Sequence, residues 1–491
     1  MSRLPTQSRK SHVLATGLLV LAALPLTPLA AQGGVQSISP KDKQEGAKAH
    51  PQLLEEFGGA EVGPQASYVE TVGKNIAVQS GLSNARGDFT VTLLNSPVDN
   101  AFAIPGGYVY VTRQLVTLMN NEAELAGVLG HEVGHVAARH SAKRQSTATR
   151  NSILGVLGQV LGSWIGGGFG NILSQGAQYG TQILTLKYSR GQETEADNLG
   201  ISYLQRAGYD PRAMSSVLQN LANQNALDAR LQGSSNRVPE WASTHPDPAS
   251  RVKAALARAG ANATGVTNRD TFLSRIDGLR YGDDPKQGVV DGRRFVHPDY
   301  RLAFEAPSGF YMINGTRSVS ITGQSGKGEF STGPYSGNLE AYVSGVFAAL
   351  AQQGQAQIRP STLERTTVNG LPAAYGIARV NSGSSGQVDV VVFAYEFSPT
   401  QAYHFMTITQ AGRSSVFNPM FQSVRRISTA EAAAVRPRRL TVVTAQRGDT
   451  VQSLAARMAY TDAPLDRFIV LNGLKANSTI AAGQRFKLIT Y

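Results

Sequence analysis

The stretch "NEAELAGVLGHEVGHVAARH", residues 121–140, decides which fold the first half of this chain is expected to adopt. It opens with Asn121 and two glutamates, which are residues that cap and begin an α-helix. Apolar residues on one side of that helix would form a buried stripe, namely Leu125, Val128, Leu129 and Val136. His131 and His135 lie four residues apart and share a helical face, so both rings can reach one metal ion.

Two further residues of this stretch carry different expectations. Glu132 stands beside the two histidines, where a carboxylate can take a proton from a metal-activated water. His140 follows His135 by five residues, which is about 140° around a helix. We therefore expect His140 to point elsewhere and to be structural. A chance match, or a buried pair of histidines that holds no metal, is the alternative for the whole motif.

A second helical stretch, "YSRGQETEADNLG" at residues 188–200, offers more ligands. A zinc hydrolase needs a third protein ligand and an open fourth position. Glu193 can be that ligand, and Asp197, four residues on, can accept the second N–H of a ligand histidine and fix its tautomer. Taken alone, the same run is equally typical of a solvated acidic start of a helix.

Together with "NAFAIPGGYVYVTRQLV" at residues 100–116, these stretches resemble the HtpX/CAAX-prenyl-protease class of zinc metallopeptidases. The similarity covers about residues 40 to 260 and is closest to the periplasmic, BepA-type branch without membrane helices. It implies a mainly α (α+β) gluzincin-type fold that holds one zinc ion (Zn2+) per chain. It implies His131, His135 and Glu193 as metal ligands and Glu132 as catalytic base. It also implies that Asp197 is the hydrogen-bond partner of a ligand histidine. Glu195 competes with Glu193 by proximity alone, and the family spacing before "AD" selects Glu193.

The resemblance also singles out a histidine and a strand. "STHPDPASR", residues 243–251, places His245 in a motif that the family carries near its metal. His245 would either act catalytically by stabilising the oxyanion or occupy the fourth position in a resting form; an ordinary loop histidine is the alternative. "GGYVYVT", residues 106–112, resembles the edge strand beside which an extended substrate would pair through its backbone.

The N-terminus indicates export. Residues 1–31 combine a basic start, an apolar core of about 14 residues and a small-residue site, as in a signal peptide; an uncut signal anchor is the alternative. The chain has no cysteine and a formal net charge of +12. A periplasmic protein of this charge suits anionic lipid surfaces or the acidic cell wall. No arginine-rich block with interleaved aromatics occurs, so nucleic acid is not an expected partner.

Residues 151–180 are apolar and rich in glycine, yet they contain no purely apolar run of 18 residues that would span a membrane. Two interpretations remain open. The segment is either a lid or hairpin that contacts a membrane surface, or a buried pair of helices packed through alanine and glycine.

We expect a multidomain chain. A protease domain at residues 36–270 should be mainly helical, with one strand pair at 90–96 and 108–115 and a turn-rich stretch between them. Residues 288–430 read as an α+β module of unknown role, with a helix at 339–353.

The C-terminal residues 438–491 contain "LTVVTAQRGDTVQSLAARM" and "LDRFIVLNGLKANSTIAAGQRFKLI". These stretches resemble a LysM module with the order strand, helix, helix, strand (βααβ). The resemblance implies that residues 440–491 bind N-acetylglucosamine glycans such as peptidoglycan, as a tether separable from the protease.

These features favour an exported, periplasmic zinc endopeptidase that cleaves extended or misfolded envelope polypeptides and is associated with the wall. Two other classes stay open. One is a wall-associated chaperone or scaffold whose metal site is latent. The other is a hydrolase of peptidoglycan stem peptides that residues 440–491 direct to the wall.

Overall fold

The computed structural model describes residues 38–140, 188–231, 245, 248–260, 262–354, 358–381 and 387–491. The expected signal peptide at 1–31 and the expected membrane-contact segment at 151–180 lie outside these described residues. Within the described part of the chain, no helix has both the length and the apolar character needed to cross a membrane.

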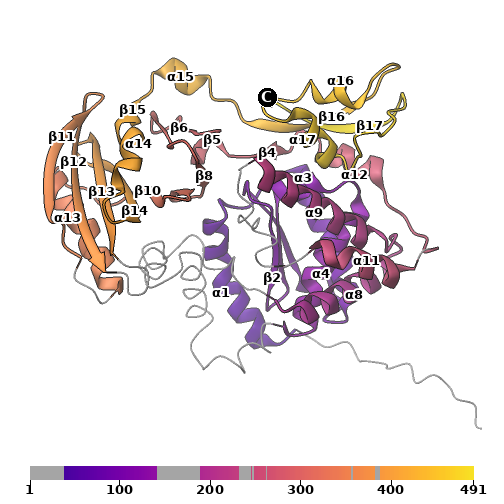
Figure 1. Cartoon of the computed structure of the whole chain (residues 1–491). Coiled ribbons are helices and arrows are strands. Elements are labelled where there is room, and N and C mark those ends of the chain that lie inside the picture. The colour runs from indigo at the N-terminus through magenta and orange to yellow at the C-terminus, as the bar shows by residue number, and fades with distance from the viewer. Residues whose placement is uncertain are drawn as a thin grey trace, which may run out of the picture. The chain divides into compact units, whose positions relative to one another are not determined.

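The first half of the chain is mainly helical, as expected, and contains a small sheet (Figure 1). The sheet consists of β1 (Thr90–Leu94), β2 (Ala101–Ile104) and β3 (Tyr108–Thr112). The helices that accompany it are α1 (Pro40–Glu56), α2 (Pro64–Ala77), α3 (Arg113–Leu118), α4 (Glu122–Ala137), α8 (Arg190–Arg206), α9 (Ala213–Leu231), α11 (Pro248–Ala259) and α12 (Arg269–Ile276). Helices α2, α4, α8 and α9 pack against one another and bury a common apolar core.

The order of the strands corrects two expectations. The sheet runs β1-β3-β2, with β3 parallel to β1 and antiparallel to β2. The stretch expected to be only turns therefore contains strand β2, whose residues alternate between buried and half-buried before Pro105 begins the turn. The stretch expected to be the edge strand is the central strand β3. The edge strands are β1 and β2, and β2 lies against α4.

The next region is rich in strands, and it has the expected helix. Seven antiparallel strands form one sheet in the order β11-β12-β13-β14-β10-β9-β8. Their bounds are β8 (Phe310–Asn314), β9 (Val319–Gly323), β10 (Gly326–Thr332), β11 (Thr362–Val368), β12 (Leu371–Asn381), β13 (Gln387–Ser398) and β14 (Gln401–Gln410). A smaller sheet, β15-β7-β6-β5, joins β5 (Val289–Asp291), β6 (Arg294–His297), β7 (Leu302–Glu305) and β15 (Arg425–Arg426).

Both faces of the seven-stranded sheet are covered. Helix α13 (Leu339–Gly354) packs on one face, where Val390 and Val392 of β13 point. The alternate residues Val391 and Phe393 face the other core, which includes residues of β7 and of α14 (Asn418–Ser423). A strand that is buried on both faces reads as a nearly continuous apolar run, and "VDVVVFAYEF" in β13 has this pattern.

The C-terminal elements follow the expected order. They are β16 (Arg438–Thr444), α16 (Val451–Ala455), α17 (Pro464–Leu471) and β17 (Arg485–Thr490), and the two strands pair antiparallel. Thr450 caps α16 and exchanges capping-box hydrogen bonds with Ser453. A short helix, α15 (Thr429–Ala433), precedes them.

These C-terminal elements are packed into the first half of the chain, which contradicts the expectation of a separable tether. Strand β16 pairs with β4 (Arg280–Tyr281) as well as with β17. The buried side chains Leu440, Phe468 and Leu488 belong to the same core as α4. The fully buried Lys487 Nζ donates to the carbonyls of Thr117, at 2.7 Å, and Met119, at 2.6 Å.

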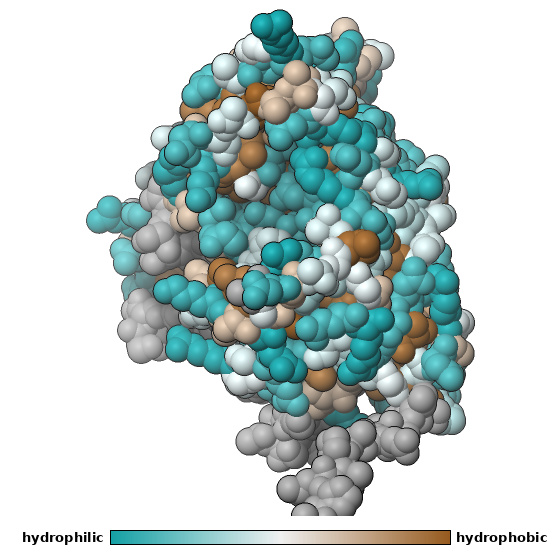
Figure 2. Space-filling view, turned by 90° about the vertical axis from the view of Figure 1, so that its right-hand side faces the viewer, coloured by the Kyte–Doolittle hydropathy of each residue, from teal (hydrophilic) through white to brown (hydrophobic). Residues whose placement is uncertain are grey.

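The face of the molecule drawn in Figure 2 is mostly hydrophilic, and its hydrophobic residues lie in small, separate groups. Scattered exposed apolar residues are normal for a folded protein in water. Among the described residues drawn on this face, no broad apolar surface is visible.

Candidate metal centre

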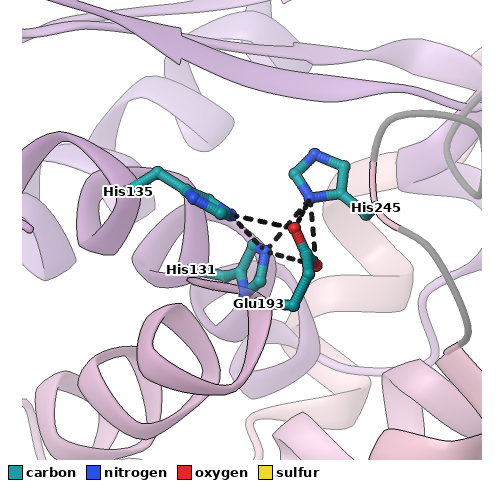
Figure 3. A group of neighbouring side chains, drawn as sticks. All are labelled: His131, His135, Glu193 and His245. Carbon is teal, nitrogen blue, oxygen red and sulfur yellow. Dashed lines mark hydrogen bonds and ion pairs between the residues drawn. The ribbon is translucent and has the colours of Figure 1, made fainter. Parts of the chain in front are cut away.

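Four buried side chains converge between α4, α8 and the segment before α11. They are His131 and His135 of α4, Glu193 of α8, and His245, and one ligand atom from each lies within 4.8 Å of the others (Figure 3). The Nε2 atoms of the two α4 histidines are 3.0 Å apart. The carboxylate oxygens of Glu193 lie 3.6 Å from His131 Nε2 and 3.5 Å from His135 Nε2.

Small residues let α4 and α8 approach closely enough to bring these groups together. A Cβ on Gly200 of α8 would stand 3.1 Å from the backbone nitrogen of His131. A Cβ on Gly134 of α4 would stand 3.2 Å from the carbonyl oxygen of Ala196. The N-terminus of α4 is fixed by Asn121, whose side chain accepts a hydrogen bond from the Glu124 N–H at 2.9 Å. The helix that carries the histidines is thus anchored at one end and packed tightly along its length.

The four side chains fit a zinc-type ion by the chemistry of their donors. Imidazole nitrogens and a carboxylate are common zinc ligands, and they bind as neutral histidine and ionised carboxylate. Burial lowers the pKa of His135 well below its ordinary value, which keeps that ring neutral. Burial alone would raise the pKa of Glu193, but the charge of His245 and contacts with His135 and His131 outweigh it and lower that pKa. The protonation states of His135 and Glu193 are therefore those that a metal requires.

Asp197 lies behind the first histidine, where the sequence predicted it. Its Oδ1 is 2.9 Å from His131 Nδ1, so it can accept that N–H and leave Nε2 free for an ion. Burial opposes ionisation of Asp197, yet hydrogen bonds to His131 and Arg251 lower its pKa.

Arg251 is a member of the site that sequence reasoning missed. This buried guanidinium, on α11, donates from Nε and Nη2 to both oxygens of Asp197, at 2.7 and 2.5 Å. It also donates to Glu193 Oε2. Arg251 therefore balances the charge of two carboxylates that burial would otherwise destabilise. Its only signal in the sequence is its place at the end of "STHPDPASR", six residues after His245.

Glu132 lies within the cluster and retains an unused acceptor. Its side chain is buried, and among the described residues its Oε1 has no hydrogen-bond partner. His245 Nε2 lies 3.5 Å from that oxygen. Burial raises the pKa of Glu132. A buried carboxylate with a free oxygen and a raised pKa is suited to accept and return a proton.

His245 faces the ligand atoms directly. Its Nδ1 lies 3.1 and 3.3 Å from the two oxygens of Glu193 and 3.3 Å from His131 Nε2. Burial opposes its protonation, but the negative charges of Glu193 and Glu132 exceed that effect and raise its pKa. An Nδ1 in this position could be a fourth ligand.

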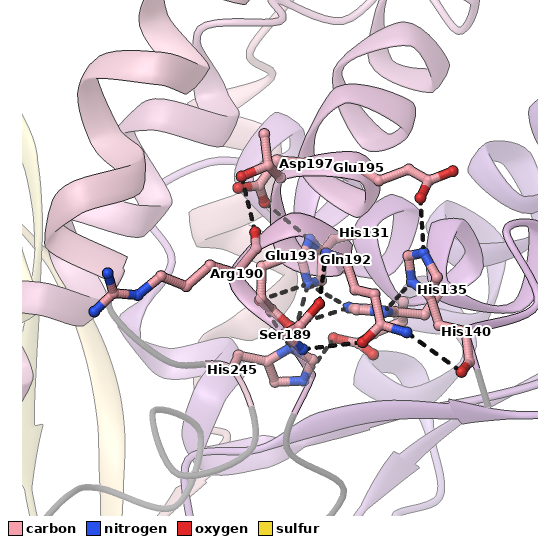
Figure 4. A network of polar contacts seen from close by, with 12 residues as sticks. His131, His135, His140, Ser189, Arg190, Gln192, Glu193, Glu195, Asp197 and His245 are labelled. Atoms are coloured by element: carbon pink, nitrogen blue, oxygen red, sulfur yellow. Dashed lines mark hydrogen bonds and ion pairs between the residues drawn. The ribbon is translucent and has the colours of Figure 1, made fainter. Parts of the chain in front are cut away.

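His140 is not where helical geometry placed it. Helix α4 ends at Ala137, and Arg139 takes a left-handed backbone conformation with φ of 53°. The chain therefore turns back, and His140 Nδ1 comes to lie 2.9 Å from His135 Nδ1 (Figure 4). The expected direction of His140 is wrong because α4 does not extend to it, whereas the expectation that His140 is not a ligand agrees with its position outside the group of four. The rival ligand Glu195 contacts His140 Nε2 at 3.1 Å and is outside the group of four.

Known proteins resemble the part of the chain that holds this site. Residues 64–259 match the model of peptidase family M48. The beta-barrel assembly-enhancing protease of Yersinia pestis is 36% identical over 195 residues, which cover 39% of this chain and 38% of that protein. The protein of the same name in Escherichia coli (strain K12) is 35% identical over the same shares of each chain. The mitochondrial metalloendopeptidase OMA1 of Schizosaccharomyces pombe is 30% identical over 215 residues, covering 43% of this chain and 59% of that protein.

A histidine pair on one helix and a buried carboxylate from a second form a ligand arrangement that metal-dependent peptidases use. Residues 64–259 are similar to peptidase family M48, which agrees with the metallopeptidase resemblance seen in the sequence of this part of the chain. The chain spans less than two thirds of each relative. The LysM resemblance of the C-terminal residues stays a prediction.

Proposed function

We propose that this protein is a zinc-dependent endopeptidase of the cell envelope that cleaves extended or misfolded polypeptides. The observation that carries the proposal is the buried group His131, His135 and Glu193, with Glu132 beside it, inside an M48 domain. The relatives' names, a protease and a metalloendopeptidase, support the same class of reaction.

The side chains divide the chemistry between them. When bound, zinc supplies a Lewis acid for the scissile carbonyl and makes a water acidic enough to react. Glu132 takes the proton of the attacking water on its free oxygen and delivers it to the leaving amine. Asp197 and Arg251 hold His131 and Glu193 in place throughout, through the contacts described above.

The hydrogen-bond pattern of strand β2 favours the proposal that the substrate is an extended chain. The N–H of Thr112 donates to the carbonyl of Asn100 at 2.9 Å, and the register continues from that pair along β2 and β3. Hydrogen-bonded and non-bonded pairs alternate in such a ladder. Ala101 and Ala103 consequently direct their N–H and C=O groups away from β3, and we place the pairing with a substrate strand at Ala103, because Ala101 is completely buried. Recognition through the backbone favours unfolded chains over any one sequence.

We assign His245 to the fourth position in a resting form, because its Nδ1 faces the other ligand atoms. A substrate carbonyl would then have to displace that ring before cleavage. The other role, a donor to the oxyanion, would require the ring to turn away from Glu193.

Export and wall association complete the proposal. The signal peptide at 1–31 would deliver the protein to the periplasm, residues 440–491 would bind peptidoglycan glycan as a LysM-like module, and 151–180 would touch a membrane surface. The division into domains at 36–270, 288–430 and 438–491 belongs to the same proposal. No role is assigned to residues 288–430.

One comparison tests the activity. Purified protein should degrade unfolded casein and leave muropeptides intact, and a chelator or Glu132→Gln should abolish the cleavage. Chelator-sensitive cleavage of muropeptides instead would favour the stem-peptide hydrolase. Protection of unfolded casein from aggregation, without cleavage, would favour the chaperone or scaffold.

A further inference from the structure

The turn after α4 brings together two residues that the proposed mechanism does not use. His140 is fully buried, with Nδ1 at 2.9 Å from His135 Nδ1 and Nε2 at 3.1 Å from Glu195 Oε2. The side-chain amide of Gln192 also donates to the carbonyl of His140, at 3.5 Å. Glu195 and Gln192, both on α8, therefore hold His140 against the ring of His135 (Figure 4).

The protons of this chain of groups can be assigned from the geometry. His135 presents Nε2 to the other ligand atoms, at 3.0 Å from His131 Nε2. A neutral imidazole that binds a cation through Nε2 carries its proton on Nδ1. His135 Nδ1–H must then donate to His140 Nδ1, which leaves the proton of His140 on Nε2. That N–H donates to the carboxylate of Glu195. Each ring nitrogen in this hydrogen-bonded series is then either a donor or an acceptor, without conflict.

We propose that His140 and Glu195 are positioning residues that fix the tautomer and orientation of His135 for metal binding. The inference rests on the proposed zinc site, and it assigns a function to the histidine that sequence spacing had set aside. Outer partners of ligand histidines orient the ring and raise its basicity. Here the partner of one ligand histidine is a second histidine backed by a carboxylate.

The two ligand histidines thus have different outer partners from the same helix. His131 Nδ1 meets Asp197 directly, at 2.9 Å, whereas His135 reaches Glu195 only through His140. The side chain of Glu195 is 51% exposed, while that of Asp197 is buried and paired with Arg251. Solvent screens the exposed carboxylate, so we expect removal of its charge to matter less than removal of His140.

The main rival explanation is that His140 only fills space. Three substitutions separate the two roles. His140→Phe keeps a ring of similar volume but cannot accept a hydrogen bond. His140→Asn places an amide oxygen near the position of Nδ1, where it can still accept from His135. Glu195→Gln removes the charge of an exposed side chain, so the variant should remain folded.

The test measures zinc affinity by competition with a chromophoric chelator, and the visible absorption bands of the cobalt-substituted protein. We expect His140→Phe to weaken zinc binding by about 10- to 100-fold and to alter the cobalt bands. His140→Asn should restore affinity to within a few-fold of the unmodified protein, and Glu195→Gln should fall between them. Thr194→Ala, on the exposed side of α8, is the matched control and should bind normally.

The outcomes distinguish the inference from the proposed function. Normal affinity and spectra in His140→Phe would overturn the inference, as would a folded His140→Asn that binds as weakly as His140→Phe. If the unmodified protein binds no zinc, or binds it equally after His131→Ala, the metal site itself is wrong. Circular dichroism of each variant establishes that it is folded.

Discussion

At the scale of single residues, Glu132 and Glu193 are both buried carboxylates beside the same histidines, yet their environments differ. Glu193 contacts His135, His245 and Arg251, and its pKa is lowered, so it stays ionised. Glu132 has a raised pKa and an oxygen without a hydrogen-bond partner among the described residues. The first environment suits a metal ligand, and the second suits a group that exchanges a proton.

This difference predicts opposite effects of two substitutions. Glu132→Gln should keep about one zinc per chain and lose at least about 100-fold in cleavage rate, because an amide cannot accept the proton. Glu193→Ala should weaken zinc binding, because it removes the only carboxylate from the four ligands proposed for the resting form. Elemental analysis and casein digestion measure the two effects. Cleavage at the unmodified rate by Glu132→Gln would contradict the mechanism.

A second residue-scale prediction concerns His245. If it occupies the fourth position at rest, His245→Ala should retain zinc on the remaining ligands and raise basal casein cleavage by about tenfold. A fall of about 100-fold would instead indicate a donor to the oxyanion. Unchanged cleavage would mean that His245 is an ordinary loop histidine.

Part of this site was predictable because one helix carries it. The spacing of His131, Glu132 and His135 follows from helical geometry alone. Choosing Glu193 over Glu195 needed the family resemblance, since both lie near the start of the same helix. Arg251 and the true position of His140 could not be predicted. The position of Arg251 depends on the packing of α11. The position of His140 depends on Arg139, whose left-handed conformation follows the early end of α4.

At the scale of elements, the close contact of α4 and α8 positions the ligands. Two glycines of α8 test this contact. An added Cβ on Gly200 would lie 3.1 Å from the backbone nitrogen of His131, whereas one on Gly191 would meet only Ser189 Oγ at 3.9 Å.

Alanine should therefore have opposite effects at these two positions. Gly191→Ala should stabilise the protein by up to about 1 kcal/mol through helix propensity. Gly200→Ala should destabilise it by about 1–3 kcal/mol, because overpacking separates the helices, and it should weaken zinc binding. Thermal unfolding and chelator competition measure both effects. An equal gain in stability from the two variants would show that α4 and α8 are not in tight contact.

A histidine in the seven-stranded sheet predicts how that region responds to acid. His404 of β14 is 8% exposed, its Nδ1 lies 2.9 Å from the hydroxyl of Tyr342 on α13, and burial lowers its pKa to about 4. The unfolded chain takes up this proton near pH 6.5 and the folded chain only near pH 4. Stability should therefore fall as the pH drops through that window, by about 2 kcal/mol at pH 5.

The variant His404→Gln keeps a polar partner for Tyr342 without titrating. It should lose less stability than the unmodified protein between pH 7 and pH 5. Hydrogen exchange of β13 and β14, corrected for intrinsic rates, reports the change. Identical pH dependence in both proteins would show that His404 does not titrate differently on folding.

Prediction of the elements succeeded where the pattern was long and failed where it was short. Strand β13 was recognisable because many consecutive residues are apolar. Strand β2 has only the residues Ala101–Ile104, and the neighbouring proline and glycines made the whole stretch read as a turn. The strand order could not be inferred either, because β3 pairs with β1 in the sheet although β2 lies between them in the sequence.

At the scale of the whole molecule, the C-terminal elements belong to the core that contains the metal helix. The backbone of Leu440 exchanges hydrogen bonds with Gly278 and Leu279, at 2.9 and 2.8 Å. Lys487 is buried, with a pKa lowered by burial to about 7, and the charge of Glu124 opposes that shift. Glu124 in turn accepts the N–H of Asn120 at the start of α4, at 2.7 Å. Sequence similarity to an autonomous module gave no indication of these contacts, because they involve residues from distant parts of the chain.

Deleting residues 440–491 should therefore impair the proposed peptidase activity instead of sparing it, because the strand beside β4 and part of the common core are lost.

A finer pair of variants isolates one contact. Lys487→Met keeps the buried stem but leaves the carbonyls of Thr117 and Met119 without this donor, and should cost at least about 1 kcal/mol. Lys475→Met makes the same change at an exposed lysine of the same elements and should lie within about 0.5 kcal/mol of the unmodified protein. Urea unfolding measures both variants, and casein cleavage measures the truncated chain. A truncated protein that unfolds and cleaves normally would show that residues 440–491 are a separable tether after all.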